Sequence, residues 1–303
     1  MSKVVVTGGA GFVGRHLIQE LNAANSKMEV ISWDRPDVDI TDASTYDAQL
    51  TSLQPDWVVH LAAFSAPGDS FRQKELVWQV NVEATRMLLQ TVEKRSPGTK
   101  VLAASSADIY GTALAAGKGQ PVPELSLEDA QPCNPYAESK LEMEKMIVSE
   151  FNKRVMRVRP FPHIGPGQAR GFVTADFAYQ IAAIEAKLQP PIIKVGNLEA
   201  IRDFTDVRDV VKAYRLLMEQ GSMGEVYHIA SGQGARISQV LDELLKLSEQ
   251  EIAIEPDVAK MRPSDVPVLV GDAGKLKRQT GWEPEIGLAT SLKDVLDWWR
   301  SQF

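Results

Sequence analysis

A glycine-rich turn follows the first apolar run of the chain. Residues 4–7 are mostly β-branched and predict a buried strand, and residues 12–22 place apolar side chains on one face of a helix. Gly8, Gly11 and Gly14 stand around the turn between them. Such a turn lets the backbone approach a pyrophosphate closely, and the helix N-terminus offers unpaired N–H groups. The spacing is G-x-x-G-x-x-G rather than G-x-G-x-x-G, but its place between a strand and a helix predicts a dinucleotide site.

Strand-like and helix-like patterns alternate through the first half of the chain. Further strands are predicted at 28–33, 57–62, 100–105 and 154–159, and helices at 44–52, 76–93 and 136–152. This alternation implies parallel strands with right-handed crossovers, hence a doubly wound α/β sheet of the Rossmann type. We expect residues 1–165 to form this dinucleotide-binding domain, with a returning segment near 205–231.

The alternation stops after residue 159, where prolines and glycines predict a loop over a site. One more strand is expected at 226–230, and helices at 237–247 and 289–299. We therefore expect residues 166–303 to form mainly a smaller C-terminal lobe, which binds substrate and closes over the ends of the sheet.

Composition argues against several classes of protein. The 303 residues carry a net charge of −7, so no basic excess exists to neutralise the phosphates of a nucleic acid. No apolar run approaches the ~20 residues that a membrane-spanning helix needs. The single cysteine, Cys133, excludes an internal disulfide and is typical of a reducing cytoplasm, where we expect the protein. Histidines and cysteines do not stand at metal-ligand spacing, so no metal is expected.

Residues after the second predicted strand are candidates for the adenosine end of a dinucleotide. An acid is expected about 20 residues after the glycine turn, bonded to the ribose hydroxyls, and Asp34 stands there. Its charge repels a 2′-phosphate and favours NAD(H), whereas Arg35 can bind that phosphate. The two residues leave NADH and NADPH both open. Asp39 and Ile40 are candidates to flank the adenine, although an acid at position 39 is equally typical of a loop.

Tyr136, Lys140 and Ser106 form a candidate proton-transfer site. The tyrosine and lysine are four residues apart on a predicted helix, so their side chains share a face. An ammonium near a phenol lowers the pKa of the tyrosine, which makes the hydroxyl a usable acid and base. The spacing alone is more typical of a solvated helix pair. Ser106, however, follows the fourth predicted strand, where ligands of open α/β sheets bind, so we expect it to hydrogen-bond the reacting oxygen.

Several further segments carry a family resemblance. Residues 7–14, 60–63, 81–82, 202–209, 262–263 and 281–284, together with the catalytic trio, resemble the motifs of the NAD-dependent epimerase/dehydratase family of extended short-chain dehydrogenases/reductases. The resemblance covers essentially the whole chain. It implies an NAD(P)(H) cofactor and contacts to it from Gly8, Gly11, Phe12, Val13, Leu61, Ala62, Ala63, Asn81, Tyr136 and Lys140.

The same resemblance implies how the substrate and a second copy are bound. Arg202 and Arg262 correspond to residues that grip the diphosphate of a nucleotide sugar. Tyr136 and Ser106 would contact its sugar. Relatives usually form homodimers through helices that correspond here to about 81–93 and 136–150.

Within the family, segments 157–168 and 261–265 resemble the GDP-6-deoxy-D-lyxo-4-hexulose (GDP-4-keto-6-deoxy-D-mannose) reductases, which make GDP-D-rhamnose. The resemblance implies that NAD(P)H reduces the C4 ketone of the sugar. It also places His163 near the substrate, although a lone histidine in such a loop more often only bonds the loop. Pro162 departs from the pattern, because most relatives have there an asparagine that usually contacts the substrate.

Asp108 bears on which reaction the chain performs. Sugar 4,6-dehydratases of the family carry a glutamate two residues after the serine or threonine, and this base removes the C5 proton. Asp108 is one methylene shorter, and a displacement of ~1 Å can cost about a hundredfold in rate. The residue therefore favours reduction and leaves a dehydratase open, and it is also typical of a turn or cap. A 4-epimerase and a non-catalytic dinucleotide sensor are the other hypotheses, and the intact trio argues against the sensor.

Overall fold

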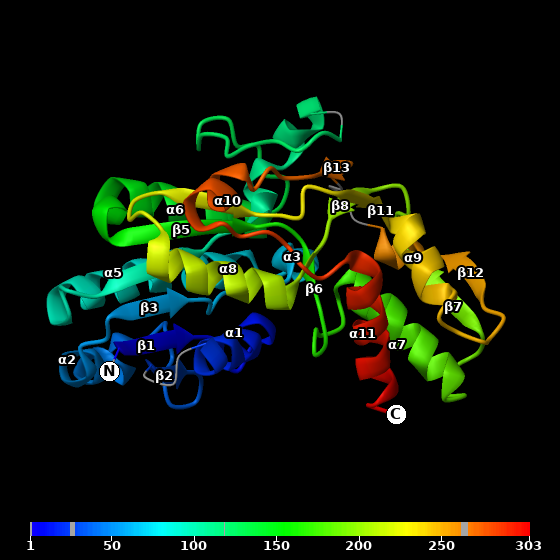
Figure 1. Ribbon diagram of the computed structural model, residues 1–303, viewed down its shortest axis with the longest axis horizontal. Coiled ribbons are helices and arrows are strands. Elements are labelled where there is room, and N and C mark those ends of the chain that lie inside the picture. Colours follow the sequence, from blue (N-terminus) through cyan, green and yellow to red (C-terminus); the bar gives the residue numbers. More distant parts are fainter. Residues whose placement is uncertain (1, 25–27, 118, 262–265) are drawn as a thin grey trace.

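The computed structural model describes residues 2–24, 28–117, 119–261 and 266–303, which form two lobes (Figure 1). The larger lobe contains a six-stranded parallel sheet in the order β10-β5-β4-β3-β1-β2. This arrangement confirms the predicted fold class. The strands are β1 (Ser2–Thr7), β2 (Met28–Trp33), β3 (Trp57–His60), β4 (Lys100–Ala104), β5 (Val155–Pro160) and β10 (Val226–Ile229).

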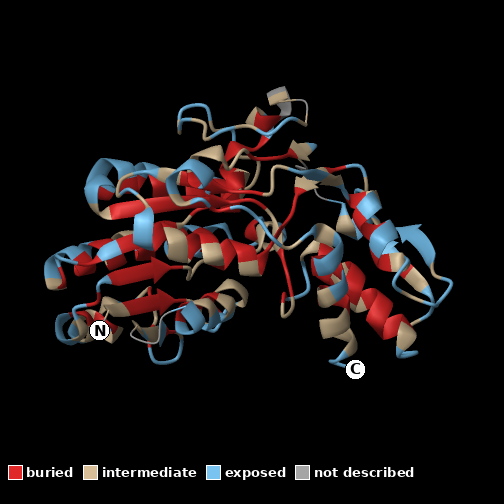
Figure 2. Cartoon of the chain, in the orientation of Figure 1, coloured by how far each residue is buried: buried red, intermediate tan, exposed pale blue. Residues whose placement is uncertain are grey.

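Alternate residues of the central strands face two separate hydrophobic cores. Val4 of β1 packs in one core with Leu17, whereas Val5 packs in the other with Leu88 and Met143. Both faces of the sheet are therefore covered, which explains why the central strands β1, β3 and β4 are mainly apolar runs (Figure 2). The first face carries α1 (Phe12–Ala24), α8 (Val207–Gln220) and α10 (Gly274–Thr280), and the second carries α2 (Asp47–Leu53), α5 (Ala84–Arg95) and α6 (Pro135–Met146).

The strand order places two connecting segments side by side. β1 pairs with β2 on one side and with β3 on the other, so the chain winds in opposite directions from β1. The segments that follow β1 and β3 meet at this switch point, where the Leu61 N–H donates to the Thr7 carbonyl at 3.1 Å. Open α/β sheets bind ligands in the crevice outside the carboxyl ends of the strands at such a point.

The smaller lobe has its own apolar core, in which Phe177, Leu241 and Leu292 pack together. These residues come from α7 (Val173–Glu185), α9 (Ile237–Leu245) and α11 (Leu288–Arg300). Short strands complete this lobe: β7 (Ile192–Val195) pairs with β12 (Ala253–Pro256), and β8 (Ile201–Asp203) pairs with β11 (Gly234–Arg236) and β13 (Val268–Leu269). Between the lobes, β6 (His163–Ile164) pairs with β9 (Thr205–Asp206).

The remaining elements are short. They are η1 (Ala43–Thr45), α3 (Pro67–Ser70), α4 (Lys74–Trp78), η2 (Gln79–Glu83), η3 (Ala107–Tyr110), η4 (Thr112–Gly117), η5 (Ile147–Phe151), η6 (Asn152–Arg154) and η7 (Val258–Lys260). Among them, η2 and η5 are π-helical turns that continue α4 into α5 and extend α6. Among the helices of the described residues, none is long and apolar enough to cross a membrane.

The structure differs from the sequence prediction at several elements. The helix expected at 44–52 is a 3-10 turn followed by α2, and the strand expected at 57–62 ends at His60. The chain bends away after His60 and its next residues face the cleft described below. The returning segment predicted near 205–231 contains α8 and β10, which join the larger lobe. The division at residue 165 stays a prediction.

Candidate active site

A cleft of about 950 Å³ opens at the carboxyl ends of the parallel strands and is lined by both lobes. The larger lobe contributes the glycine turn, the segment after β3 and the candidate catalytic residues. The C-terminal region contributes β8 and the segments around α7 and η7. Of the predicted site residues, the cleft is lined by Gly8, Gly11, Phe12, Val13, Leu61, Ala62, Ala63, Ser106, Asp108, Tyr136, Lys140, His163 and Arg202.

The glycine turn has no room for side chains. Gly8 has a φ of +73°, and a Cβ there would lie 2.9 Å from the backbone nitrogen of Ala62. A Cβ at Gly14 would lie 2.2 Å from the Gly8 carbonyl oxygen, so the first turn of α1 packs directly on the strand end. Bare backbone at a helix N-terminus is what a dinucleotide pyrophosphate requires, and this geometry fits the predicted cofactor.

The residues predicted for the adenosine end lie outside the cleft lining. Asp34 accepts hydrogen bonds from the Ala10 N–H, at 3.0 Å to each carboxylate oxygen, so it holds the glycine turn. Arg35 is exposed beside it. Asp39 accepts from Thr41, whose backbone N–H and hydroxyl lower the pKa of that carboxyl, and Ile40 is buried. Their roles toward a cofactor stay predictions.

Asn81 also lies behind the cleft wall. Its amide oxygen accepts from the Phe64 N–H at 2.8 Å, and its amide nitrogen donates to the Phe64 carbonyl and to the Ser139 hydroxyl. The side chain therefore joins the segment that follows β3 to the helix α6. In this structure it positions the wall formed by Ala62 and Ala63.

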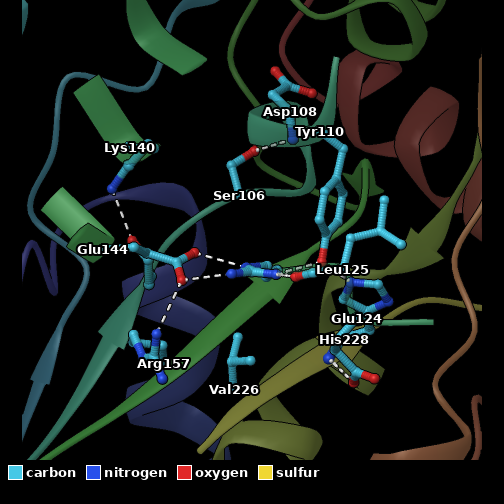
Figure 3. Close-up of polar contacts among 12 residues, drawn as sticks. Ser106, Asp108, Tyr110, Glu124, Leu125, Lys140, Glu144, Arg157, Val226 and His228 are labelled. Carbon is cyan, nitrogen blue, oxygen red and sulfur yellow. Dashed lines mark hydrogen bonds and ion pairs between the residues drawn. The ribbon is translucent and has the colours of Figure 1, made fainter. Parts of the chain in front are cut away.

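The candidate catalytic trio converges in the cleft from two elements. Ser106 caps the 3-10 turn η3, where its hydroxyl accepts from the Asp108 N–H at 3.1 Å (Figure 3). Tyr136 and Lys140 lie one turn apart on α6, which begins at the side-chain cap of Asn134. The Tyr136 hydroxyl hydrogen-bonds Ser106, and the Lys140 ammonium donates to the Ala104 carbonyl at 2.7 Å.

The electrostatics of Tyr136 differ from the sequence prediction. Burial raises the pKa of Tyr136, the Asp108 carboxylate raises it further, and only the hydrogen bond with Ser106 opposes them. The predicted lowering of this pKa by Lys140 is wrong for the structure, because the ammonium is bonded to a backbone carbonyl and desolvation dominates. Burial also lowers the pKa of Lys140 to about 8, against the nearby Glu144 carboxylate.

Two further predicted substrate residues, His163 of β6 and Arg202 of β8, also line the cleft. His163 stacks on Phe12 with ring centroids 6.1 Å apart, and its Nδ1 lies 3.0 Å from the Phe161 carbonyl oxygen. Burial lowers the pKa of this imidazole. Arg202 lies on β8 and donates to the Ile201 carbonyl at 2.9 Å. Arg262 lies outside the described residues, so its predicted role has no structural account.

The chain resembles known proteins over nearly its whole length. The model of the NAD dependent epimerase/dehydratase family matches residues 4–230. A GDP-6-deoxy-D-mannose reductase of Pseudomonas aeruginosa is 35% identical, over 99% of this chain and 98% of the relative. The chain belongs to the NAD-dependent epimerase/dehydratase family. A GDP-6-deoxy-D-talose 4-dehydrogenase of Aggregatibacter actinomycetemcomitans is 29% identical, over 97% of this chain and 96% of the relative.

Two solved structures have the same fold as this chain over nearly its whole length. The structure of RMD from Pseudomonas aeruginosa complexed with NADPH has a TM-score of 0.90 and 34% identity, with both chains fully covered. A UDP-glucose 4-epimerase of Thermotoga maritima with UDP-glucose has a TM-score of 0.85 and 26% identity, over 99% of each chain. The fold of this epimerase/dehydratase family member is therefore shared by reductases and epimerases alike.

Several cleft residues were missed by the sequence reasoning. Phe204 lines the cleft together with Arg202. Asp176 and Lys260 also line it and form an ion pair, with 3.3 Å between the Lys260 nitrogen and an Asp176 oxygen. They come from α7, η7 and the segment between β8 and β9, which are far apart in the sequence. Lys260 lies shortly before residues 262–265, which are outside the described residues. A spacing pattern could not have found a set that only the folding of the C-terminal lobe brings together.

Proposed function

We propose that this chain reduces the C4 ketone of a nucleotide-linked 4-keto-6-deoxy sugar with NAD(P)H, converting GDP-4-keto-6-deoxy-D-mannose to GDP-D-rhamnose. The observation that carries the proposal is the hydrogen-bonded pair Ser106 and Tyr136, with Lys140 one helical turn away, in a cleft that opens beside the glycine turn. The GDP-6-deoxy-D-mannose reductase relative and the structure complexed with NADPH support the choice of substrate and cofactor.

The roles of the residues follow from the site geometry. NAD(P)H supplies the hydride when it is bound along the glycine turn. Ser106 and Tyr136 hydrogen-bond the carbonyl oxygen of the substrate, and Tyr136 gives it a proton as negative charge develops there. The raised pKa of Tyr136 keeps the phenol protonated, as an acid requires. The Lys140 ammonium then stabilises the tyrosinate, while Arg202 and, by the family resemblance, Arg262 hold the diphosphate and so orient the sugar.

Asp108 separates this proposal from its main alternative. The residue lines the cleft two positions after Ser106, where a 4,6-dehydratase would need a base for the C5 proton. A reductase needs no such base. A 4-epimerase would use the same trio and retain its cofactor through each cycle.

The test is NAD(P)H absorbance after the enzyme is mixed with GDP-4-keto-6-deoxy-D-mannose, with GDP-mannose as a parallel sample. We expect oxidation of NAD(P)H with the keto sugar and not with GDP-mannose, and a rate about 10³-fold lower with Tyr136→Phe. A keto sugar formed from GDP-mannose without net oxidation would replace the reductase by a dehydratase. An epimerised nucleotide sugar, with cofactor retained through purification, would replace it by an epimerase.

A homodimer through the helices at 81–93 and 136–150 is also proposed. Leu76 and Trp78 on α4 are exposed just before the first segment, and Val148 on η5 is exposed within the second; exposed apolar side chains often mark an interface. Light scattering after gel filtration should give about twice the chain mass, and Trp78→Glu should lower it toward a monomer. A monomeric wild type would remove this part of the proposal. A cytoplasmic location stays a prediction that rests on the single Cys133.

A further inference from the structure

A buried network of charged and polar groups lies directly behind the catalytic residues (Figure 3). Glu144 is on α6, one turn after Lys140, and its carboxylate is fully buried. Arg159 of β5, with 1% of its side chain exposed, donates from Nε at 2.8 Å and from its second terminal nitrogen at 2.9 Å to the two carboxylate oxygens. This two-pronged geometry fixes the helix to the strand.

The remaining guanidinium nitrogen of Arg159 extends the network to a second element. It donates to the Tyr110 hydroxyl at 2.6 Å and to the Leu125 carbonyl at 2.8 Å. The Tyr110 oxygen is 2.5 Å from Nε2 of His228, and Nδ1 of that imidazole is 3.2 Å from the Asp272 carbonyl oxygen. A carbonyl only accepts, so the imidazole proton lies on Nδ1, and Tyr110 donates to Nε2.

Tyr110 does not line the cleft, but it ends the 3-10 turn whose cap, Ser106, and second residue, Asp108, do. Ser106 caps this turn and Asp108 lies within it, while the Gly111 N–H closes it on the Asp108 carbonyl at 3.1 Å. The network therefore connects the two elements of the catalytic site. One is the helix with Tyr136 and Lys140, and the other is the turn with Ser106.

A contribution to folding stability does not explain why such a network is present. Moving a carboxylate and a guanidinium out of water costs several kcal/mol each, and apolar replacements of similar volume are often as stable. Precise positioning of the catalytic groups explains it better, because a 1 Å displacement of such a group can lower the rate about a hundredfold.

We propose that Tyr110, held by the Arg159–Glu144 pair, is a positioning residue that sets the distance between the Ser106 and Tyr136 hydroxyls. The proposal concerns the proposed reduction and deepens it. It predicts that the Tyr110 hydroxyl matters for turnover even though it touches neither substrate nor cofactor.

The test uses Tyr110→Phe, which removes one hydroxyl and keeps the ring, with Tyr227→Phe as a matched control. Tyr227 is also buried, and its hydroxyl accepts a hydrogen bond from the Ser222 N–H at 3.0 Å, away from the cleft. We expect kcat of Tyr110→Phe to fall at least about tenfold with KM for the nucleotide sugar within about twofold. The control should keep its kcat. Equal kcat in both variants, or a loss confined to KM, overturns the proposal.

A double variant separates positioning from general weakening. If Tyr110 acts by placing Ser106, its removal costs little once the serine hydroxyl is gone, so Tyr110→Phe/Ser106→Ala should turn over at nearly the rate of Ser106→Ala. If the fold-losses in kcat of the two single variants multiply in the double variant, Tyr110 acts independently of Ser106 and the proposal is refuted.

Amide hydrogen exchange tests the same idea without substrate. Residues 106–111 should exchange faster in Tyr110→Phe than in the wild type, and should be unchanged in Tyr227→Phe. Unchanged exchange in this segment refutes the positioning role. A wild type that leaves the keto sugar unreduced refutes the proposed function, and the exchange comparison still decides the role of Tyr110.

Discussion

The two walls of the cleft are built in different ways. On the wall of the larger lobe, hydrogen bonds hold each functional group: Lys140 to the Ala104 carbonyl, Tyr136 to Ser106, and Asn81 to the backbone of Phe64. On the wall formed by the C-terminal region, Lys260 and Asp176 are joined by an ion pair of 3.3 Å, and both side chains are partly exposed.

This difference teaches how one fold serves several reactions. The rigid wall holds the groups that transfer a proton, and its geometry follows from the sheet. The other wall consists of side chains from short strands, loops and the first turns of α7, which can change without disturbing the sheet. Relatives named as reductases and as epimerases are thus expected to differ mainly on that second wall.

The largest effect is expected from the rigid wall. Tyr136→Phe removes the general acid, and kcat should fall about 10³-fold, within the range for acid–base catalysis. NAD(P)H binding, measured by fluorescence titration, should change by less than about twofold, because the ring remains in place. A variant that keeps a tenth of the wild-type kcat would show that another group donates the proton.

On the opposite wall, Arg202→Ala should act on binding. Loss of a charge-assisted bond to the diphosphate should raise KM for the nucleotide sugar about tenfold or more, with kcat within about threefold. Arg236→Ala is the matched control, because Arg236 pairs with Glu199 at the surface of the same lobe. Equal KM values in the two variants would mean that Arg202 does not bind the diphosphate.

The pH dependence sharpens the role of Lys140. Its pKa is about 8, so the ammonium is lost above that pH and kcat/KM should fall up to about tenfold per pH unit. In Lys140→Arg the guanidinium stays charged, and any remaining activity should lose this alkaline limb. A limb that persists unchanged in Lys140→Arg would assign the titration to another group.

The same shift predicts how stability changes with pH. The pKa of Lys140 is lowered on folding from 10.5, so between about pH 8 and pH 10.5 the unfolded chain binds more protons than the folded one. Through this group, stability should therefore rise with pH across that window. Urea unfolding of the wild type and of Lys140→Met at pH 7.5 and 9.5 measures the difference, and a wild-type gain no larger than that of Lys140→Met would contradict it.

The smallest effects are expected at the adenosine end. Arg35→Ala should weaken NADPH relative to NADH by about three- to tenfold, because an exposed cation contributes modestly to a phosphate contact. Asp34→Asn should shift the preference toward NADPH, since it removes a negative charge and can still accept from the Ala10 N–H. The ratio of kcat/KM with NADPH to kcat/KM with NADH measures the effect of each substitution. If both variants shift this ratio in the same direction, Asp34 and Arg35 do not have the opposing roles assigned to them at the ribose 2′-position.

The sequence by itself determined the sheet and the catalytic helix. Gly8 and Gly14 predict the turn because only glycine fits where a strand end and a helix are in direct backbone contact. Tyr136 and Lys140 share a face because helical geometry fixes residues four apart. These are local rules, which act within a few residues, and a sequence displays them directly.

The tertiary structure alone decided what surrounds these groups. It joined Lys260 to Asp176 within one wall of the cleft, and it buried Glu144 against Arg159, which also bonds Tyr110 behind the catalytic turn. It also reversed the predicted pKa shift of Tyr136, because desolvation depends on every element packed around the phenol. Such effects sum over residues far apart in the chain, so no spacing in the sequence contains them.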